Sequence, residues 1–231
     1  MRTTRGVIAG ALTILLVATA SAVTPAAHAQ AGLLAVGMEI EIGSNGCSLG
    51  FFAFDTRKDR LAVTAGHCAS GVDQIVYNKF GNRVGSVVAH MNDSSTSRKA
   101  IRARGYTVIH IDDSWRIEPY FKATASASKG DSVTKFGLHG KTAGSITDTY
   151  YDSDAPWMST IQGDVVTLGG DSGGPWVTSG PTLLGITASG DYENGANHDD
   201  GSQAQPIWSL VTLIRDNAEA WGQGFNVWLD D

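Results

Sequence analysis

The sequence predicts an all-β protein, either a barrel or a sandwich, from two observations. Short runs of β-branched and aromatic residues recur along the chain between clusters of Gly, Asn, Asp and Ser. Runs of this kind, bounded by turn residues at short intervals, are typical of all-β folds. The chain of 231 residues also contains 28 glycines, which suits the number of turns that such a fold needs.

The expected strands fall into two groups, one in each half of the chain. The first group begins with the alternation of a half-buried strand and covers residues 37–42, 50–54, 61–65, 74–77, 84–89 and 106–111. The second group covers residues 132–136, 145–147, 163–168, 175–178 and 183–187. Two polar stretches, 92–104 and 191–202, are expected to be exposed loops.

One helix is expected near the C-terminus. After Pro206, the apolar residues Ile207, Leu210, Val211 and Ile214 recur at helical spacing. The pattern predicts a helix over about 209–220 that closes the domain.

The N-terminal residues have the features of a secretory signal. Arg2 and Arg5 precede an apolar stretch from Val7 to about Ala20, and residues 27–29 form a small-x-small cleavage site. We therefore predict a signal peptide over 1–29. The apolar stretch is short for a membrane span, which needs about 20 residues. The mature protein is expected to be secreted, with association with the cell envelope through a retained anchor as the alternative.

The mature chain, residues 30–231, is expected to form a single domain with a double core, since its length of roughly 200 residues suits one domain. Removing residues 1–29 removes two arginines and no acidic residue, so the formal charge changes from −6 to −8. This acidic balance argues against nucleic-acid binding, which requires a basic patch. We also expect a monomer with no cofactor. No metal is expected, because no Cys/His cluster has zinc spacing.

Two short motifs carry the chemistry. Residues 64–68 place His67 at the end of an apolar run, and residues 170–175 place Ser172 in a glycine-rich loop. A serine hydroxyl is a poor nucleophile until a neighbouring base takes its proton, and the intermediate needs donors for its oxyanion. We therefore predict Ser172 as nucleophile and His67 as general base.

With both motifs in this order, the sequence resembles the chymotrypsin-like (trypsin-like) serine proteases, especially small secreted bacterial members such as streptogrisins and α-lytic protease. The resemblance implies two six-stranded antiparallel β-barrels, at about 35–120 and 121–231, with the active site between them and a C-terminal helix. It also implies an oxyanion hole formed by the backbone N–H groups of Gly170 and Ser172, and a peptide or protein substrate.

The sequence departs from the family at the third catalytic position. In the family an Asp opens the strand that matches residues 105–111, whereas this chain has Gly105. Replacing that Asp by its amide costs about 10⁴ in kcat. Asp112 lies roughly 20 Å further along the strand and cannot take its place. Asp93, in the preceding polar stretch, is the candidate stand-in, and the alternative is that it only forms a local turn.

Three further features follow from the resemblance. The family pairing implies a disulfide between Cys47 and Cys68, with two free buried thiols as the alternative. Asp171 is expected to be buried and to need a cation, for which Lys135 is the candidate; an exposed Lys135 is the alternative. The substrate pocket floor falls near residues 166–167, where no acidic residue sits, so a preference for Arg or Lys is not expected.

The leading hypothesis is therefore a secreted serine endopeptidase that forms an acyl-enzyme on Ser172, with His67 as base. Gly105 leaves open a catalytically weak or inactive protein of the same fold that binds a peptide or protein partner. A third hypothesis is an esterase with the same site geometry.

Overall fold

The structure is a computed structural model that describes residues 32–97, 100–193 and 196–230, without the side chains of 95–102 and 191–200. Residues Ala31–Asp231 form one compact unit. The predicted signal peptide, 1–29, lies outside the described residues. None of the helices in the described part of the chain is both long and apolar enough to cross a membrane.

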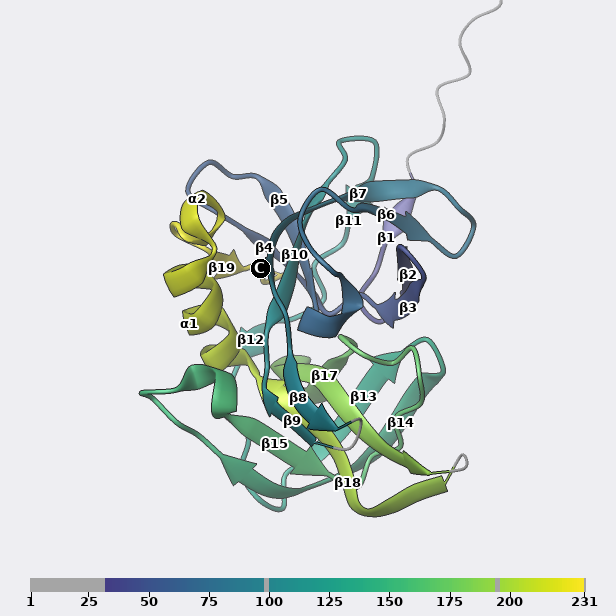
Figure 1. Cartoon of the computed structure of the whole chain (residues 1–231), viewed down its shortest axis with the longest axis vertical. Coiled ribbons are helices and arrows are strands. Elements are labelled where there is room, and N and C mark those ends of the chain that lie inside the picture. The colour runs from purple at the N-terminus through teal and green to yellow at the C-terminus, as the bar shows by residue number, and fades with distance from the viewer. Residues whose placement is uncertain (1–31, 98–99, 194–195, 231) are drawn as a thin grey trace, which may run out of the picture. The chain divides into compact units, whose positions relative to one another are not determined.

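The first half of the chain forms an eight-stranded antiparallel sheet that curls into a barrel (Figure 1). Its spatial order is β19-β4-β5-β10-β7-β6-β2-β3. Backbone hydrogen bonds from Gly37 N to Leu49 O and from Leu49 N to Met38 O extend the pairing of β2 with β3. The strands are β2 (Glu39–Ile42), β3 (Asn45–Ser48), β4 (Phe51–Phe54), β5 (Arg60–Thr64), β6 (Ile75–Asn78), β7 (Arg83–Met91), β10 (Tyr106–Ile111) and β19 (Asn226–Val227).

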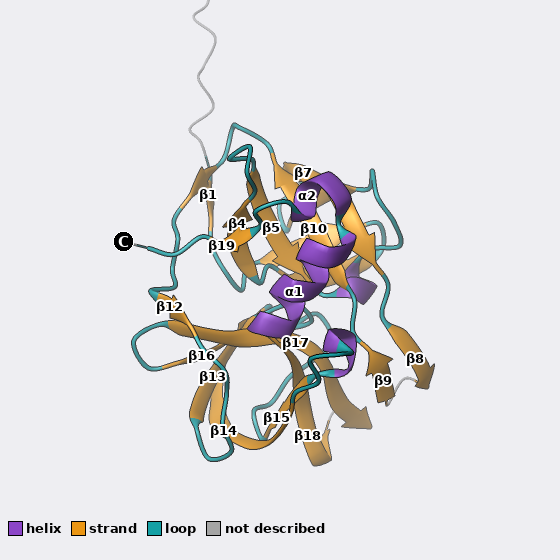
Figure 2. Ribbon diagram, turned by 90° about the vertical axis from the view of Figure 1, so that its left-hand side faces the viewer, coloured by secondary structure: helices purple, strands orange, loops and turns teal. Residues whose placement is uncertain are grey.

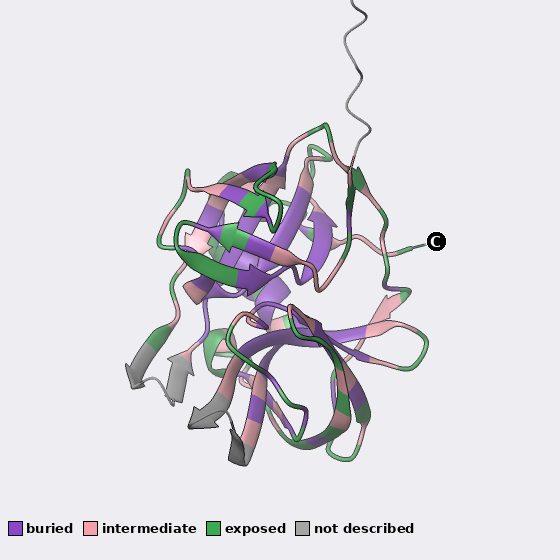
Figure 3. Cartoon of the chain, turned by 90° about the vertical axis from the view of Figure 1, so that its right-hand side faces the viewer, coloured by how far each residue is buried: buried purple, intermediate pink, exposed green. Residues whose placement is uncertain are grey.

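The second half forms a closed six-stranded barrel, because β17 pairs with both β16 and β18. Its interior is filled around Trp176, which is fully buried and donates its Nε1–H to Thr187 Oγ1 at 3.0 Å. Figure 3 shows the buried segments on the strands of both barrels. The strands are β12 (Ala123–Thr124), β13 (Ser132–Gly137), β14 (Gly140–Tyr150), β15 (Thr160–Gly163), β16 (Pro175–Thr178), β17 (Thr182–Glu193) and β18 (Ala196–Pro206), with β12 attached at the edge.

The C-terminal helix packs where the two barrels meet, in a core cluster to which strands of both contribute (Figure 2). α1 runs from Ile207 to Asn217, and the short α2 (Glu219–Gly222) follows. Ile207, Leu210, Val211 and Ile214 are all buried in the core cluster that contains Phe51. This is the apolar stripe seen in the sequence. Together, the two barrels and the helix confirm the predicted fold class.

Three local predictions were wrong. The stretch 92–104 contains a hairpin of β8 (Ser94–Ser97) and β9 (Ala100–Ala103), and 191–202 belongs to the long β17–β18 hairpin. Both are rich in small or polar residues, so neither carries a period-2 apolar signal. The strand expected over 163–168 ends at Gly163, because Asp164 Oδ1 accepts the N–H of Ser145 in place of a backbone carbonyl.

The remaining short elements connect the larger ones. β1 (Leu33–Leu34) pairs in parallel with β11 (Arg116–Ile117) beside the first barrel. Two 3₁₀ turns, η1 (Gly66–Cys68) and η2 (Pro156–Met158), follow β5 and β14 along the chain. The Cys47–Cys68 disulfide links β3 to η1, which confirms the pairing implied by the resemblance.

We expect the disulfide to contribute about 3 kcal/mol to stability, the chain-entropy value for a loop closed across 21 residues. Replacing Cys47 and Cys68 together by Ala should lower the free energy of unfolding by that amount, and should raise the m-value because the unfolded chain loses its cross-link. Reducing agent should lower the midpoint of the wild type to that of the variant and leave the variant unaffected. An equal midpoint for the oxidised wild type and the variant would contradict the expectation.

Candidate active site

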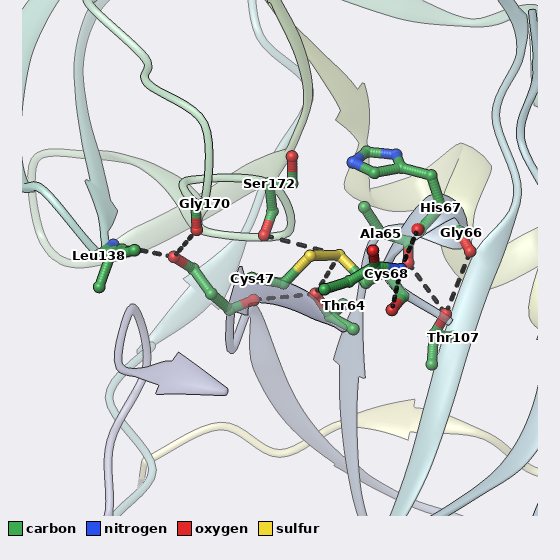
Figure 4. The surroundings of a disulfide bond; sticks show 12 residues. Cys47, Thr64, Ala65, Gly66, His67, Cys68, Thr107, Leu138, Gly170 and Ser172 are labelled. Atoms are coloured by element: carbon green, nitrogen blue, oxygen red, sulfur yellow. Dashed lines mark hydrogen bonds between the residues drawn. A yellow bond between two sulfur atoms is a disulfide. The ribbon is translucent and has the colours of Figure 1, made fainter. Parts of the chain in front are cut away.

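His67 projects from the 3₁₀ turn that follows β5. The turn is held from behind, because Thr107 Oγ1 donates to Ala65 O at 2.9 Å and His90 Nε2 lies 2.9 Å from Gly66 O. The imidazole itself is about a third exposed, at 36% of its side-chain surface. A rigid backbone therefore presents a solvent-accessible ring (Figure 4).

Asp93 lies against the back of this ring. Its Oδ2 is 2.5 Å from His67 Nδ1, and its Oδ1 accepts the N–H of Gly105 at 2.6 Å. The carboxylate is only 6% exposed. A carboxylate on Nδ1 holds the proton on that nitrogen and leaves Nε2 free to accept one. Among the described residues, Asp93 therefore occupies the position that a base-orienting carboxylate needs.

Gly105 is required by this arrangement. A Cβ at residue 105 would overlap the carbonyl oxygen of Met91, and a Cβ at residue 66 would overlap Asp93 Oδ1. The β8–β9 hairpin lies between Asp93 and Gly105 in the sequence. These two residues bond to each other, so the two ends of the hairpin meet beside His67. The missing Asp at 105 and the presence of Asp93 are thus two parts of one structural change.

Ser172 lies in a glycine-rich turn that enters β16. Gly170 and Gly173 have φ values of +100° and +83°, which disfavour any side chain. The Gly173 N–H donates to Thr187 O at 2.8 Å and anchors the turn to β17. In Figure 4 the Ser172 side chain and the His67 ring lie on the same side of the disulfide. The described residues show no hydrogen bond between them, and such bonds are often long before substrate binds.

Ser48 is a residue that the sequence analysis missed. Its hydroxyl donates to Gly170 O at 2.8 Å and accepts the N–H of Leu138 at 2.9 Å, while its own N–H donates to Ser172 O at 2.8 Å. It is fully buried. Ser48 therefore ties the Ser172 turn to the first barrel. Its position next to a disulfide cysteine was the only sequence signal for this role.

Asp171 and Lys135 form the predicted buried pair, with Nζ–Oδ2 at 2.6 Å and both side chains fully buried. Burial alone would raise the pKa of Asp171. Hydrogen bonds from the N–H of His139, the ammonium of Lys135 and the N–H of Leu168 outweigh it and lower the pKa below the usual 3.8. Asp171 is thus an anchored anion beneath the Ser172 turn.

The expected pocket floor is neutral among the described residues. Thr167 is buried and its hydroxyl lies 2.7 Å from that of Ser202, which donates to Val165 O at 2.7 Å. Val166 points elsewhere and is 42% exposed. These hydroxyls satisfy one another, and no described carboxylate bonds to them.

Comparison with known proteins finds similarity in structure only. No protein-family model matches the sequence, and no curated protein matches it significantly. Among solved structures, Protease A of Thermobifida fusca is 20% identical, with a TM-score of 0.62 over 86% of this chain and 100% of that one. A Nocardiopsis protease is 19% identical, with a TM-score of 0.60 over 85% and 99%.

A third similar structure is a glutamic-acid-specific serine protease, 24% identical with a TM-score of 0.57, covering 78% of this chain and 96% of that one. At these identities the likeness concerns the fold. The chain therefore has the double-barrel fold of the chymotrypsin-like bacterial serine proteases.

Replacing Asp171 by Asn should destabilise the protein by about 3–5 kcal/mol, because Lys135 is left buried without its anion. A group whose pKa is lowered by folding contributes stability above its unfolded pKa and loses it as pH falls through the folded value. The wild type should therefore lose stability below pH 3.8, and the variant should lose less over that range. Urea denaturation at several pH values measures both; equal slopes for the two proteins would contradict the assignment.

Replacing Gly105 by Ala should destabilise the protein by about 1–3 kcal/mol, the usual range for overpacking, because the new Cβ overlaps Met91 O. Gly71→Ala is the matched control, since nothing lies within 4 Å of a Cβ there. Thermal denaturation of both variants measures the difference. A Gly105 variant as stable as the Gly71 variant would show that residues 91 and 105 are not in close contact.

Proposed function

We propose that the protein is a secreted serine endopeptidase with Ser172 as nucleophile, His67 as general base and Asp93 as the carboxylate that orients the base. The contact between His67 Nδ1 and Asp93 Oδ2 carries this proposal. A binding protein of the same fold has no need of a buried carboxylate that bonds to the Nδ1 of a partly exposed imidazole. Export agrees with the N-terminal signal pattern and with a disulfide, which persists in oxidising compartments.

In the acylation step, Ser172 Oγ attacks the carbonyl carbon of the scissile peptide while its proton passes to His67 Nε2. The C=O π bond breaks as the new C–O bond forms, and the electron pair moves to the carbonyl oxygen. The imidazolium then gives its proton to the leaving amine as the C–N bond breaks. Asp93 stabilises the positive ring throughout and keeps its own charge.

The oxyanion would be held by the backbone N–H groups of Gly170 and Ser172. Donors that are fixed before the reaction supply much of the rate enhancement in such sites. Ser48 and the Asp171–Lys135 pair support these donors by fixing the turn from the first and second barrels, respectively. Water then attacks the acyl carbon while His67 takes its proton. The bond from that carbon to Ser172 Oγ breaks, His67 returns the proton to Oγ, and the acid product leaves.

We propose an uncharged side chain at the substrate residue that precedes the scissile bond. The hydroxyls of Thr167 and Ser202 are paired with each other, and the expected floor of the pocket holds no described acidic group. A substrate lysine or arginine would have no counter-ion there. Peptides with an apolar residue at this position should be cleaved faster than those with Arg or Lys.

Fluorophosphonate labelling of the mature chain, from Gln30 onward, tests the proposal, since the probe reacts with activated serines. Labelling should be lost in Ser172→Ala. It should fall by about 10⁴ in Asp93→Asn, the cost of removing the orienting carboxylate. Asp112→Asn is the matched control, because this aspartate pairs with Arg83 on the surface. Its labelling should equal that of the wild type.

Two outcomes would redirect the proposal. Labelling lost with Ser172→Ala but kept with Asp93→Asn would reduce the site to a Ser–His dyad. No labelling of the folded wild type would instead favour the peptide-binding alternative. Ester and amide substrates with the same acyl group then separate an esterase from an endopeptidase.

A further inference from the structure

Arg104 is a buried cation outside the proposed mechanism. Its residue is 4% exposed, and its Nε has no hydrogen-bond partner in the structure. Among the described side chains it forms no ion pair with a carboxylate. A buried charge without a bonded opposite charge destabilises the folded state. We therefore asked what Arg104 could do for the candidate active site beside it.

Arg104 connects the end of the β8–β9 hairpin to the second barrel through three contacts. Its N–H donates to Trp157 O at 2.8 Å, its Nη2 donates to Gln203 Oε1 at 2.7 Å, and its carbonyl accepts from Gln205 Nε2 at 3.5 Å. The next residue, Gly105, holds the Asp93 carboxylate. Thus Gly105 bonds to Asp93, and the adjacent Arg104 bonds to the second barrel.

The guanidinium also acts on Asp93 through space. Burial lowers the pKa of Arg104 to about 10, and the negative charge of Asp93 opposes that shift. The other titratable groups in contact with this corner are His67, on Asp93, and His90, on the η1 turn.

This inference rests on the proposed function. We propose that Arg104 is a positioning residue for the catalytic base: through its contacts it fixes Asp93 relative to the second barrel. The Arg104–Gln203 contact reaches Ser189 as well, because Ser189 Oγ donates to the same Gln203 oxygen at 3.3 Å. Arg104 therefore links the carboxylate of the first barrel to β17, which also anchors the Ser172 turn.

The test compares stability with site geometry in Arg104→Met and Arg104→Lys. Replacing a buried ionic group by an apolar one of similar volume is often neutral or stabilising, so the Met variant should keep or raise Tm. Its fluorophosphonate labelling rate should nevertheless fall roughly tenfold, which corresponds to about 1.4 kcal/mol of transition-state stabilisation. Lys keeps the charge and should restore part of the rate. Labelling of the Met variant at the wild-type rate would overturn the proposal.

A second variant covers the case in which Arg104→Met does not fold. Gln203→Glu gives the guanidinium a carboxylate of its own, so it should raise Tm and lower the labelling rate, because the positive charge is drawn away from Asp93. Gln223→Glu is the control, since residue 223 is exposed and its carbonyl accepts the N–H of Thr56 beside the first barrel. Equal loss of labelling in both Glu variants would overturn the proposal.

A proton NMR readout separates this proposal from the proposed function. An imidazole N–H bonded to a carboxylate gives a far-downfield signal, whether or not Ser172 is reactive. An unlabelled wild type would defeat the proposed function alone. The His67 signal should still be present in the wild type, lost in Arg104→Met and shifted in Gln203→Glu. An unchanged signal in a folded variant would overturn the role of Arg104.

Discussion

The arrangement of the candidate site depends on one carboxylate that bonds in two directions. Asp93 receives the His67 ring on one oxygen and the Gly105 N–H on the other. The second bond fixes the carboxylate to the start of β10, a fully paired strand in the middle of the first sheet. The imidazole thereby takes its orientation from the barrel core.

The two barrels meet through a shared apolar cluster and through buried polar contacts. Ser48 and Thr64, from the first barrel, contact each other and the Ser172 turn, while Lys135 and Asp171 hold that turn from the second. Paired buried groups of this kind specify one arrangement at some cost in stability. Within the described residues, Arg104 is the member of this interface whose charge is not matched by a bonded anion.

The two motifs predicted the double barrel through the family that they resemble. Apolar periodicity predicted a helix over about 209–220, and the helix begins at Ile207. Ser172 and Asp171 could be named because the glycine-rich turn is local in sequence, whereas Lys135, 36 residues from Asp171, was named from the family resemblance. Asp93 could only be offered as a candidate, since its role depends on a turn of the chain that brings residues 93 and 105 together. The hairpin of small residues between them gives no alternating signal. Ser48 and Arg104 were invisible because their partners are more than 50 residues away along the chain.

The hairpin that separates Asp93 from Gly105 has an entropic consequence. Its two ends are held by the Asp93–Gly105 hydrogen bond, so the geometry at His67 is independent of how many residues lie between them. Loop-closure entropy rises only with the logarithm of length, about 0.6 kcal/mol for each doubling. This segment can therefore grow or shrink at its tip over evolutionary time at little thermodynamic cost, while the carboxylate stays in place.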